Sequence, residues 1–263
     1  MGYQDFKNLF IEVADNVALL TINRPAVLNS LDSSVLDDLL EAFTALDQDP
    51  AVKVVVLTGS GEKAFVAGAD IAQIADYNVQ QALGFARKGQ HLVSVIGRMA
   101  KPVIAAVNGF ALGGGLEMAL ACDFAYASEK AKLGLPEVTL GVMPGFGGTQ
   151  KLARLIGRSR CNELIFTGKV LTATEAKEWG IVNAIYPAAE LIAKTMETAR
   201  KIADNGLLGV AHAKDAVRGG LDMAEADGMN FESLQFAALF ATADQKEGMN
   251  AFLEKRKPVF SGT

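Results

Sequence analysis

The sequence predicts an α/β protein with a parallel core and a purely helical C-terminal part. Aliphatic runs alternate with amphipathic helical segments along most of the chain, an order typical of a parallel sheet covered by helices. From about Ala188 onward the strand signals vanish. The remaining segments all predict helices, over residues 189–204, 207–220, 222–240 and 244–256.

Length and charge narrow the possible classes of protein. The 263 residues allow one large domain or two small ones, and half are hydrophobic, as in a folded protein. A net charge of −5 argues against a nucleic-acid partner, which normally leaves a basic footprint. No apolar run approaches the roughly 18–20 residues of a membrane span, and the N-terminus lacks a signal-sequence layout. We therefore expect a cytoplasmic protein that binds neither nucleic acid nor membrane.

Residues suited to redox or metal chemistry are few and scattered. Cys122 and Cys161 lack metal-ligand spacing and are expected to be reduced core thiols. His91 and His212 are expected at the surface or in packing, and no metal site is predicted. The segment 145–148 lacks the sixth-position glycine of a dinucleotide loop, and neither a phosphate loop nor a nucleophile elbow occurs. The groups that remain as candidates for catalysis are carboxylates and backbone N–H groups.

The N-terminal segments predict a hairpin, a helix and a buried strand. Residues 9–22 are strand-like, with a polar break at 15–16 that predicts a β-hairpin. Segment 33–46 has apolar residues at helical spacing, and Asp32 is placed to cap it. Residues 52–57 are aliphatic apart from Lys53, a pattern typical of a strand covered on both faces.

A first junction of strand, small-residue turn and helix follows. The strand-like residues 64–67 meet the breaker Gly68, and Asp70 is placed to cap a helix that continues past it. A longer helix is predicted from about Val79 to Met99.

The second junction, within residues 101–123, carries an unusual charge. Its strand, 103–107, leads through the glycines 113–115 into an apolar helix over 116–122, whose one charge is Glu117. Charged residues are seldom fully buried unless paired, so Glu117 is a candidate for a carboxylate with a tuned pKa. The alternative is an acid that caps the first turn of a core helix. Unpaired N–H groups at the start of this helix could stabilise a developing oxyanion.

The next segments repeat this plan. A short strand over 124–127, a helix over 149–156, a capping box at 172–175 and a strand over 181–185 are predicted. Three units share the order of strand, turn and helix, near 52–76, 101–122 and 124–157. This repetition suits a spiral of similar turns at least as well as a flat doubly wound sheet.

Glu137 is a second acid in an apolar setting. It follows Pro136 in a run of apolar and small residues. By itself such a glutamate more often begins a helix or faces solvent. Together with Glu117 and the two glycine turns, it becomes a candidate for a partner carboxylate.

Several segments together carry a family resemblance. They are Asn23-Arg-Pro-x-x-x-Asn29-x-Leu31, Ala64-Phe-x-Ala-Gly-Ala-Asp70, Lys101-Pro-Val-Ile-Ala-Ala-Val-Asn-Gly109, Gly113-Gly-Gly-x-Glu117, Cys122-Asp123, Leu135-Pro-Glu137, Gly141-x-x-Pro-Gly-x-Gly-Gly-Thr-Gln150, Thr167-Gly-x-x-x-x-Ala173, Glu175-Ala and Glu247-Gly-Met-x-Ala-Phe252. They run in order from about residue 10 to 257. On these residues the chain resembles the crotonase superfamily, and within it the enoyl-CoA hydratases.

The resemblance implies a fold and an assembly. It implies a crotonase-like spiral of ββα turns over residues 1–195 that holds the active site, and a helical oligomerisation region over 196–263, together one family domain. It also implies trimerisation through the helical region, usually as a homo-hexamer of two trimers. The substrates would be acyl-CoA thioesters, and no cofactor is implied beyond the coenzyme A that they carry.

The implied activity is the reversible syn addition of water to a trans-2-enoyl-CoA, giving a 3-hydroxyacyl-CoA. The paired glutamates of the hydratases correspond to Glu117 and Glu137, and the assignment of acid and base stays open. The paired N–H donors for the thioester oxygen correspond to Ala69 and Gly114, and the N–H of Gly145 would help to hold the water. Adjacent carboxylates split their titrations, so the pair can share one proton at neutral pH.

The resemblance also implies where the substrate lies. The implied substrate and CoA contacts are Val27, Leu28, Ala67, Ala69, Asp70, Ile71, Gly114, Phe252 and Lys255. The last two correspond to residues that reach a neighbouring subunit's coenzyme; the alternative is a capping helix with a solvated lysine. Val27 stands where many members have a lysine, which removes one phosphate contact. The acyl pocket should involve the loop 72–100 and Leu116, Val142 and Phe146.

Two other functions remain open. One is different acyl-CoA chemistry in the same superfamily, as in an isomerase, a dehalogenase or a hydrolase. Isomerases often keep only the carboxylate that corresponds to Glu137, so Glu117 argues against them. The other is a non-catalytic RNA-binding or scaffolding role, which the acidic charge balance disfavours.

Overall fold

The computed structural model describes residues 6–263, and a six-stranded sheet forms the centre of that part. Its strands lie in the order β1 (Leu9–Ala14), β2 (Val17–Ile22), β3 (Val54–Gly59), β5 (Val103–Val107), β7 (Phe124–Ser128) and β10 (Ala184–Tyr186). The β1–β2 pair is antiparallel and all other neighbours are parallel. The predicted hairpin and parallel core are therefore confirmed.

A second sheet of four strands runs beside the first. It consists of β4 (Ala64–Val66), β6 (Phe110–Leu112), β8 (Lys132–Gly134) and β9 (Val170–Thr172). Strands β4, β6 and β8 each follow directly on a strand of the larger sheet and precede a helix or helical turn. This repeated ββα unit is the spiral that the sequence predicts. Strands β6, β8 and β9 were not expected, because each has only three residues and so leaves no periodic pattern.

Local sequence signals explain how several elements begin. Asp15 and Asn16 form the hairpin turn with φ values of 52° and 61°, a left-handed conformation that Asp and Asn tolerate. Asp32 accepts a hydrogen bond of 2.9 Å from the N–H of Val35 and caps α1 (Ser33–Gln48). Thr172 and Glu175 form the predicted capping box at α7 (Ala173–Glu178).

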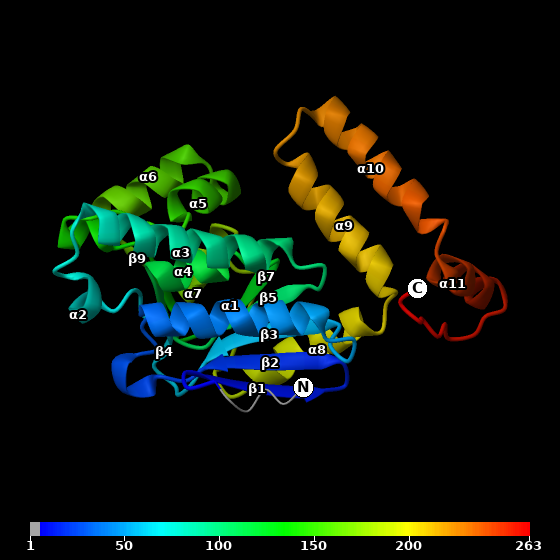
Figure 1. Ribbon diagram of the computed structural model, residues 1–263, viewed down its shortest axis with the longest axis horizontal. Coiled ribbons are helices and arrows are strands. Elements are labelled where there is room, and N and C mark those ends of the chain that lie inside the picture. The colour runs from blue at the N-terminus through cyan, green and yellow to red at the C-terminus, as the bar shows by residue number, and fades with distance from the viewer. Residues whose placement is uncertain (1–5) are drawn as a thin grey trace.

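Helices cover both faces of the larger sheet (Figure 1). The helical elements of the core are η1 (Pro25–Val27), α1, α2 (Ile71–Ile74), α3 (Val79–Arg98), α4 (Gly114–Ala119), η2 (Glu137–Leu140), α5 (Gly148–Ile156), α6 (Arg158–Thr167), α7 and α8 (Leu191–Ala203). Every residue of β3 and β5 is buried, as the aliphatic residues that make up most of both strands predict. Helix α8 packs on one face through Leu191, Ala199 and Ala203. The domain division expected at residue 195 falls inside α8 and stays a prediction.

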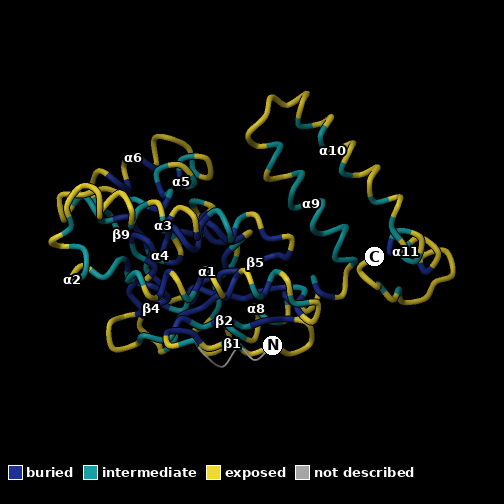
Figure 2. Tube along the Cα trace, in the orientation of Figure 1, coloured by how far each residue is buried: buried dark blue, intermediate teal, exposed yellow. Residues whose placement is uncertain are grey.

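The last three helices project from one end of the core. They are α9 (Leu207–Gly220), α10 (Glu225–Leu239) and α11 (Ala243–Leu253). Helices α9 and α10 pair side by side (Figure 1), and Figure 2 shows this part largely intermediate or exposed, in contrast to the buried core. Asp244 and Ala251 of α11 are the buried residues within these three helices. The predicted helical C-terminal part is thus confirmed.

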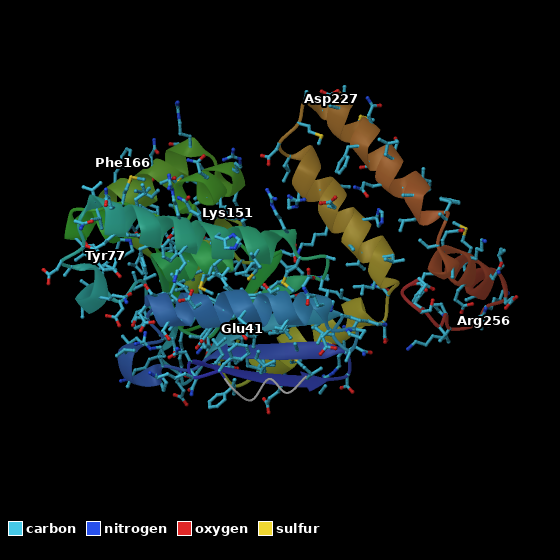
Figure 3. The ribbon with its side chains drawn as sticks, viewed as in Figure 1. Glu41, Tyr77, Lys151, Phe166, Asp227 and Arg256 are labelled. Atoms are coloured by element: carbon cyan, nitrogen blue, oxygen red, sulfur yellow. The ribbon has the colours of Figure 1, made fainter. Side chains whose placement is uncertain are left out.

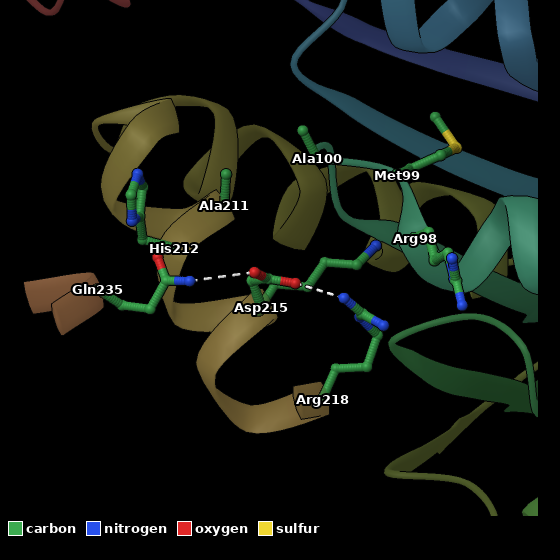
Figure 4. A pocket seen from close by; sticks show the side chains of 9 residues that line it. Arg98, Met99, Ala100, Ala211, His212, Asp215, Arg218 and Gln235 are labelled. Carbon is green, nitrogen blue, oxygen red and sulfur yellow. Dashed lines mark hydrogen bonds and ion pairs between the residues drawn. The ribbon is translucent and has the colours of Figure 1, made fainter. Parts of the chain in front are cut away.

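A polar seam joins α9 to the core. The ammonium of Lys214 lies 2.9 Å from a carboxylate oxygen of Asp123 and donates to the carbonyl of Lys101 at 3.1 Å. Beside it lies a cavity of about 310 Å³ (Figure 4), where Asp215 is bound by both Arg218 and Gln235. The Lys214–Asp123 pair ties α9 to the core, and the hydrogen bond from Gln235 to Asp215 ties α10 to α9.

Cys122 and Cys161 are both buried and carry free thiols, as expected for core cysteines. Among the helices of residues 6–263, none is long and apolar enough to cross a membrane. No group of three or more His, Cys, Asp or Glu side chains is suitably placed for a metal ion anywhere in that part of the chain.

Candidate active site

The two strand–turn–helix junctions open onto one cavity of about 940 Å³. Its walls come from α2, α3, the start of α4 and the segment 136–150. The predicted residues that line it are Ala67, Ala69, Ile71, Gly114, Glu117, Glu137 and Gly145. Apolar side chains form most of the remaining wall, as is typical of a small-molecule binding site.

Glu117 stands in the first turn of α4 and is 1% exposed. One of its oxygens, Oε1, accepts hydrogen bonds from the N–H groups of Phe146 at 2.8 Å and Gly148 at 2.6 Å. Gly147, with φ of 112°, lets the chain turn so that these amides face the carboxylate. Burial raises the pKa of Glu117, and the N–H groups of Gly148, Phe146 and Gly147 oppose that rise because they favour the charged form.

Glu137 begins the 3-10 turn η2, and its surroundings differ. Its Oε2 is buried and has no hydrogen-bond partner within residues 6–263. Burial raises the pKa of Glu137 to about 7, and the charge of Glu117 also raises it. A carboxyl group with this pKa is often protonated at neutral pH, and its proton would satisfy the solitary oxygen.

Two backbone N–H groups lie beside the carboxylates. Leu31 pairs with the strand around Ala69, since its N–H donates to Gly68 and its carbonyl accepts from Asp70. This pairing directs the N–H of Ala69 to the other side of the strand. Gly114 is the first residue of α4, where N–H groups lack intrahelical partners. Neither N–H donates to an acceptor within the described chain.

The two junctions are also in contact with each other. A Cβ added at Gly113 would lie 3.8 Å from the Cα of Gly68 and 3.0 Å from Oε1 of Glu137. The turn before Gly114 therefore lies against both the turn before Ala69 and the second carboxyl group. Two acids and two amides that are distant in sequence thus meet in one cavity.

Comparison with known proteins assigns the family. The family model described as "Enoyl-CoA hydratase/isomerase" matches residues 12–263. The chain belongs to the enoyl-CoA hydratase/isomerase family. Two relatives match over nearly their whole lengths. The crotonyl-CoA hydratase of Syntrophomonas wolfei is 46% identical over 255 residues, covering 97% of this chain and 98% of that protein. The short-chain-enoyl-CoA hydratase of Clostridium acetobutylicum is 43% identical over 253 residues, with 96% and 97% coverage.

The structural comparison agrees with this family. The crystal structure of the enoyl-CoA hydratase from Bacillus anthracis matches with a TM-score of 0.95 at 41% identity, covering 98% of this chain and 100% of that one. The crotonase-like fold and the family predicted from the sequence are therefore confirmed.

The residues that the enoyl-CoA hydratase/isomerase resemblance assigned to coenzyme binding are only partly gathered at the cavity. Val27 and Leu28 lie outside its lining, although the carbonyl of Leu28 accepts from the N–H of Ala67 at 3.1 Å. Asp70 occupies the N-cap position of α2, but its side chain makes no capping hydrogen bond. The prediction that the Asp70 side chain caps this helix was therefore wrong. Its carboxylate lies instead 3.6 Å from the guanidinium of Arg24.

Phe252 and Lys255 lie far from the cavity of their own chain. Figure 3 shows Tyr77, which lines the cavity, at the opposite end of the molecule from Arg256, the residue after Lys255. Phe252 is 83% exposed. A contact of these residues with a coenzyme would therefore need a neighbouring subunit, and it stays a prediction.

The acyl-pocket expectation holds in part. Val142, Phe146 and several residues of 72–100 line the cavity, but Leu116 is fully buried in the core. Leu116 precedes Glu117 by one residue on α4, and successive helical residues point about 100° apart. The sequence did not indicate Gln90, which also lines the cavity and donates to the carbonyl of Gly145 at 3.0 Å. An exposed glutamine on an amphipathic helix carries no motif that could have revealed it.

Proposed function

We propose that this chain is an enoyl-CoA hydratase, a hydro-lyase that adds water reversibly to trans-2-enoyl-CoA thioesters. The observation that supports this best is the pair of carboxyl groups with unlike surroundings in one cavity, beside two backbone N–H groups that find no acceptor among residues 6–263. The family and the names of the two relatives point to the same reaction.

The surroundings of the acids suggest their roles. Glu117 is the base, because two N–H donors on Oε1 favour its ionised form. Its Oε2 would accept a proton from a water molecule as the water oxygen attacks Cβ. Glu137, protonated because burial raises its pKa to about 7, would deliver its proton to Cα. The product gains one water, and a proton passed from Glu117 to Glu137 through solvent restores the pair.

The two amides would carry the charge that develops in this step. As the oxygen attacks Cβ, the electrons of the double bond move onto the thioester oxygen. Donors at Ala69 and Gly114 would stabilise that oxyanion without reorganising, and loss of one such donor typically costs about 10²–10³ in rate. The N–H of Gly145 would help to hold the attacking water.

The finer parts of the proposal concern substrate and assembly. Val27, Leu28, Ala67, Asp70 and Ile71 would lie along the coenzyme. Phe252 and Lys255 would reach the coenzyme of a neighbour in a homo-hexamer. The reaction would draw only on side chains, backbone and the substrate's own coenzyme A, in the cytoplasm. Short acyl chains are proposed because the two relatives carry the names crotonyl-CoA and short-chain-enoyl-CoA hydratase.

The direct test is turnover of trans-2-butenoyl-CoA. We expect the absorbance of the conjugated thioester to fall and the product to gain the mass of one water, with ¹⁸O incorporated from labelled water. A panel of longer 2-enoyl thioesters would then rank chain lengths, with the shortest used best. Isomerised product without added mass, or tight RNA binding at elevated salt without thioester turnover, would overturn the proposal.

A further inference from the structure

One short span of the cavity wall depends on a single side chain for its polar contacts. Within the described residues, Met143, Pro144 and Gly145 take part in one hydrogen bond, from Nε2 of Gln90 to the carbonyl oxygen of Gly145 at 3.0 Å. A carbonyl can only accept, so the amide of Gln90 must present its nitrogen. Gln90 therefore anchors a span that makes no other hydrogen bond with residues 6–263.

The anchored carbonyl belongs to the same peptide unit as a donor to Glu117. The C=O of Gly145 and the N–H of Phe146 lie in one plane and point in opposite directions, because a peptide bond is planar and trans. The carbonyl accepts from Gln90, and the N–H donates to Oε1 of Glu117 at 2.8 Å. Rotation of this peptide away from Gln90 would turn its N–H away from the carboxylate.

Helix α3 shapes the same peptide by packing. A Cβ added at Gly89 would lie 2.1 Å from the ring of Phe146, so only a glycine lets that ring sit against the helix. A Cβ added at Gly145 would lie 3.7 Å from the Cβ of Ala86. Residues on one turn of α3 thus lie close to both Gly145 and Phe146. Packing sets its distance from the helix, and Gln90 sets its rotation.

We propose that Gln90 is a positioning residue for the reaction, which acts on Glu117 through the Gly145–Phe146 peptide. This rests on the proposed hydratase function, in which Glu117 must be ionised. The N–H of Phe146 favours the ionised form, and the bond from Gln90 keeps that N–H directed at the carboxylate. The same hydrogen bond also orients Gly145, whose own N–H is proposed to hold the water.

The test replaces the donor while keeping the shape of the side chain. Gln90→Met has similar length and helix propensity but no N–H group. Gln80→Met, on the exposed surface of the same helix, is the matched control. Gln90→His restores a donor of similar reach. Activity should be followed as kcat/KM across pH with trans-2-butenoyl-CoA, and thermal unfolding should be recorded for every variant.

We expect the acidic limb of the kcat/KM profile to move to higher pH in Gln90→Met, since loss of a donor raises the pKa of Glu117. At a pH on that limb, kcat/KM of Gln90→Met should be roughly fivefold below that of the wild type, which is the effect of one ordinary hydrogen bond. Gln90→His should recover much of it, and Gln80→Met should match the wild type. A carboxyl ¹³C NMR titration of Glu117 in a Glu137→Gln background should show the same rise without relying on turnover.

A purely structural role would give a different result. Gln90→Met would then unfold at a lower temperature while the position of the acidic limb and the ¹³C titration stayed unchanged, and this outcome would overturn the inference. Failure of the proposed function would appear separately, because the wild-type protein itself would then not hydrate the thioester.

Discussion

Glu117 and Glu137 face the same cavity from two regions that offer a carboxyl group different hydrogen bonds. Glu117 starts a helix, and the turn before α5 directs two N–H groups at one of its oxygens. Glu137 starts a 3-10 turn, and its buried Oε2 has no partner within residues 6–263. Burial raises both pKa values; three N–H groups of the segment 146–148 oppose the rise at Glu117, whereas at Glu137 only its own backbone N–H does. The two regions thus differ in how strongly the backbone favours the charged form of the same side chain.

The largest expected effect comes from removing either acid. Glu117→Gln and Glu137→Gln should each lower kcat for hydration by roughly 10²–10⁴, the usual contribution of a positioned acid or base. Glutamine at 117 can still accept from the N–H groups of Phe146 and Gly148, so the fold should survive. Steady-state kinetics with trans-2-butenoyl-CoA measure both variants.

Glu178→Gln, at an exposed position on α7, is the control and should turn over substrate normally. If either active-site variant keeps near wild-type turnover, the two regions do not divide the chemistry as proposed.

A smaller effect should follow from crowding each region separately. A Cβ at Gly148 would lie 2.9 Å from Oε1 of Glu117, and one at Gly113 would lie 3.0 Å from Oε1 of Glu137. Gly148→Ala and Gly113→Ala should therefore displace one carboxylate each and lower kcat/KM about 10- to 100-fold. Gly113→Ala also strains a backbone with φ of 52°.

Gly84→Ala provides the matched control, because nothing lies within 4 Å of the added Cβ on α3. That variant should keep full activity and unfold at a slightly higher temperature, since alanine favours a helix. Equal, small losses in Gly148→Ala and Gly113→Ala would mean that neither carboxylate needs its observed position.

Much of this comparison could be anticipated from the sequence. Both acids stood out as charges in apolar runs, and the glycine turns indicated the free amides. The strands β3 and β5 and the C-terminal helices were predicted because long periodic or aliphatic runs depend mainly on local sequence. Helix α6 was missed because its ten residues, Arg158–Thr167, follow a glycine and are largely polar. The contrast between the acids could not be predicted, since it depends on amides of the segment 146–148 that approach only after folding.

The smallest expected effect concerns stability and tests the contrast without turnover. Glu137 has a pKa of about 7 in the folded chain against an ordinary value of 4.5. Between these pH values the folded state binds more protons than the unfolded state, so this group makes the protein less stable as pH rises. Glu137→Gln mimics the protonated acid and removes that dependence. Its melting temperature should exceed that of the wild type increasingly from pH 5 to 7 and then level off. The full difference between pKa 4.5 and 7 would correspond to about 3 kcal/mol. Because the side chain is open to solvent through the cavity, we expect a reduced gain of about 1 kcal/mol, or about 2–4 °C.

The melting temperature of Glu117→Gln can be compared with that of Glu137→Gln over the same pH range. The N–H groups of Phe146 and Gly148 stabilise the ionised form of Glu117, and the neutral amide gives up that charge-assisted bonding. The gain in melting temperature with pH should therefore be smaller at 117 than at 137, when both are measured by calorimetry at one protein concentration. A larger gain at 117 would mean that the pKa of Glu117 lies above that of Glu137, and Glu137 would then be the base.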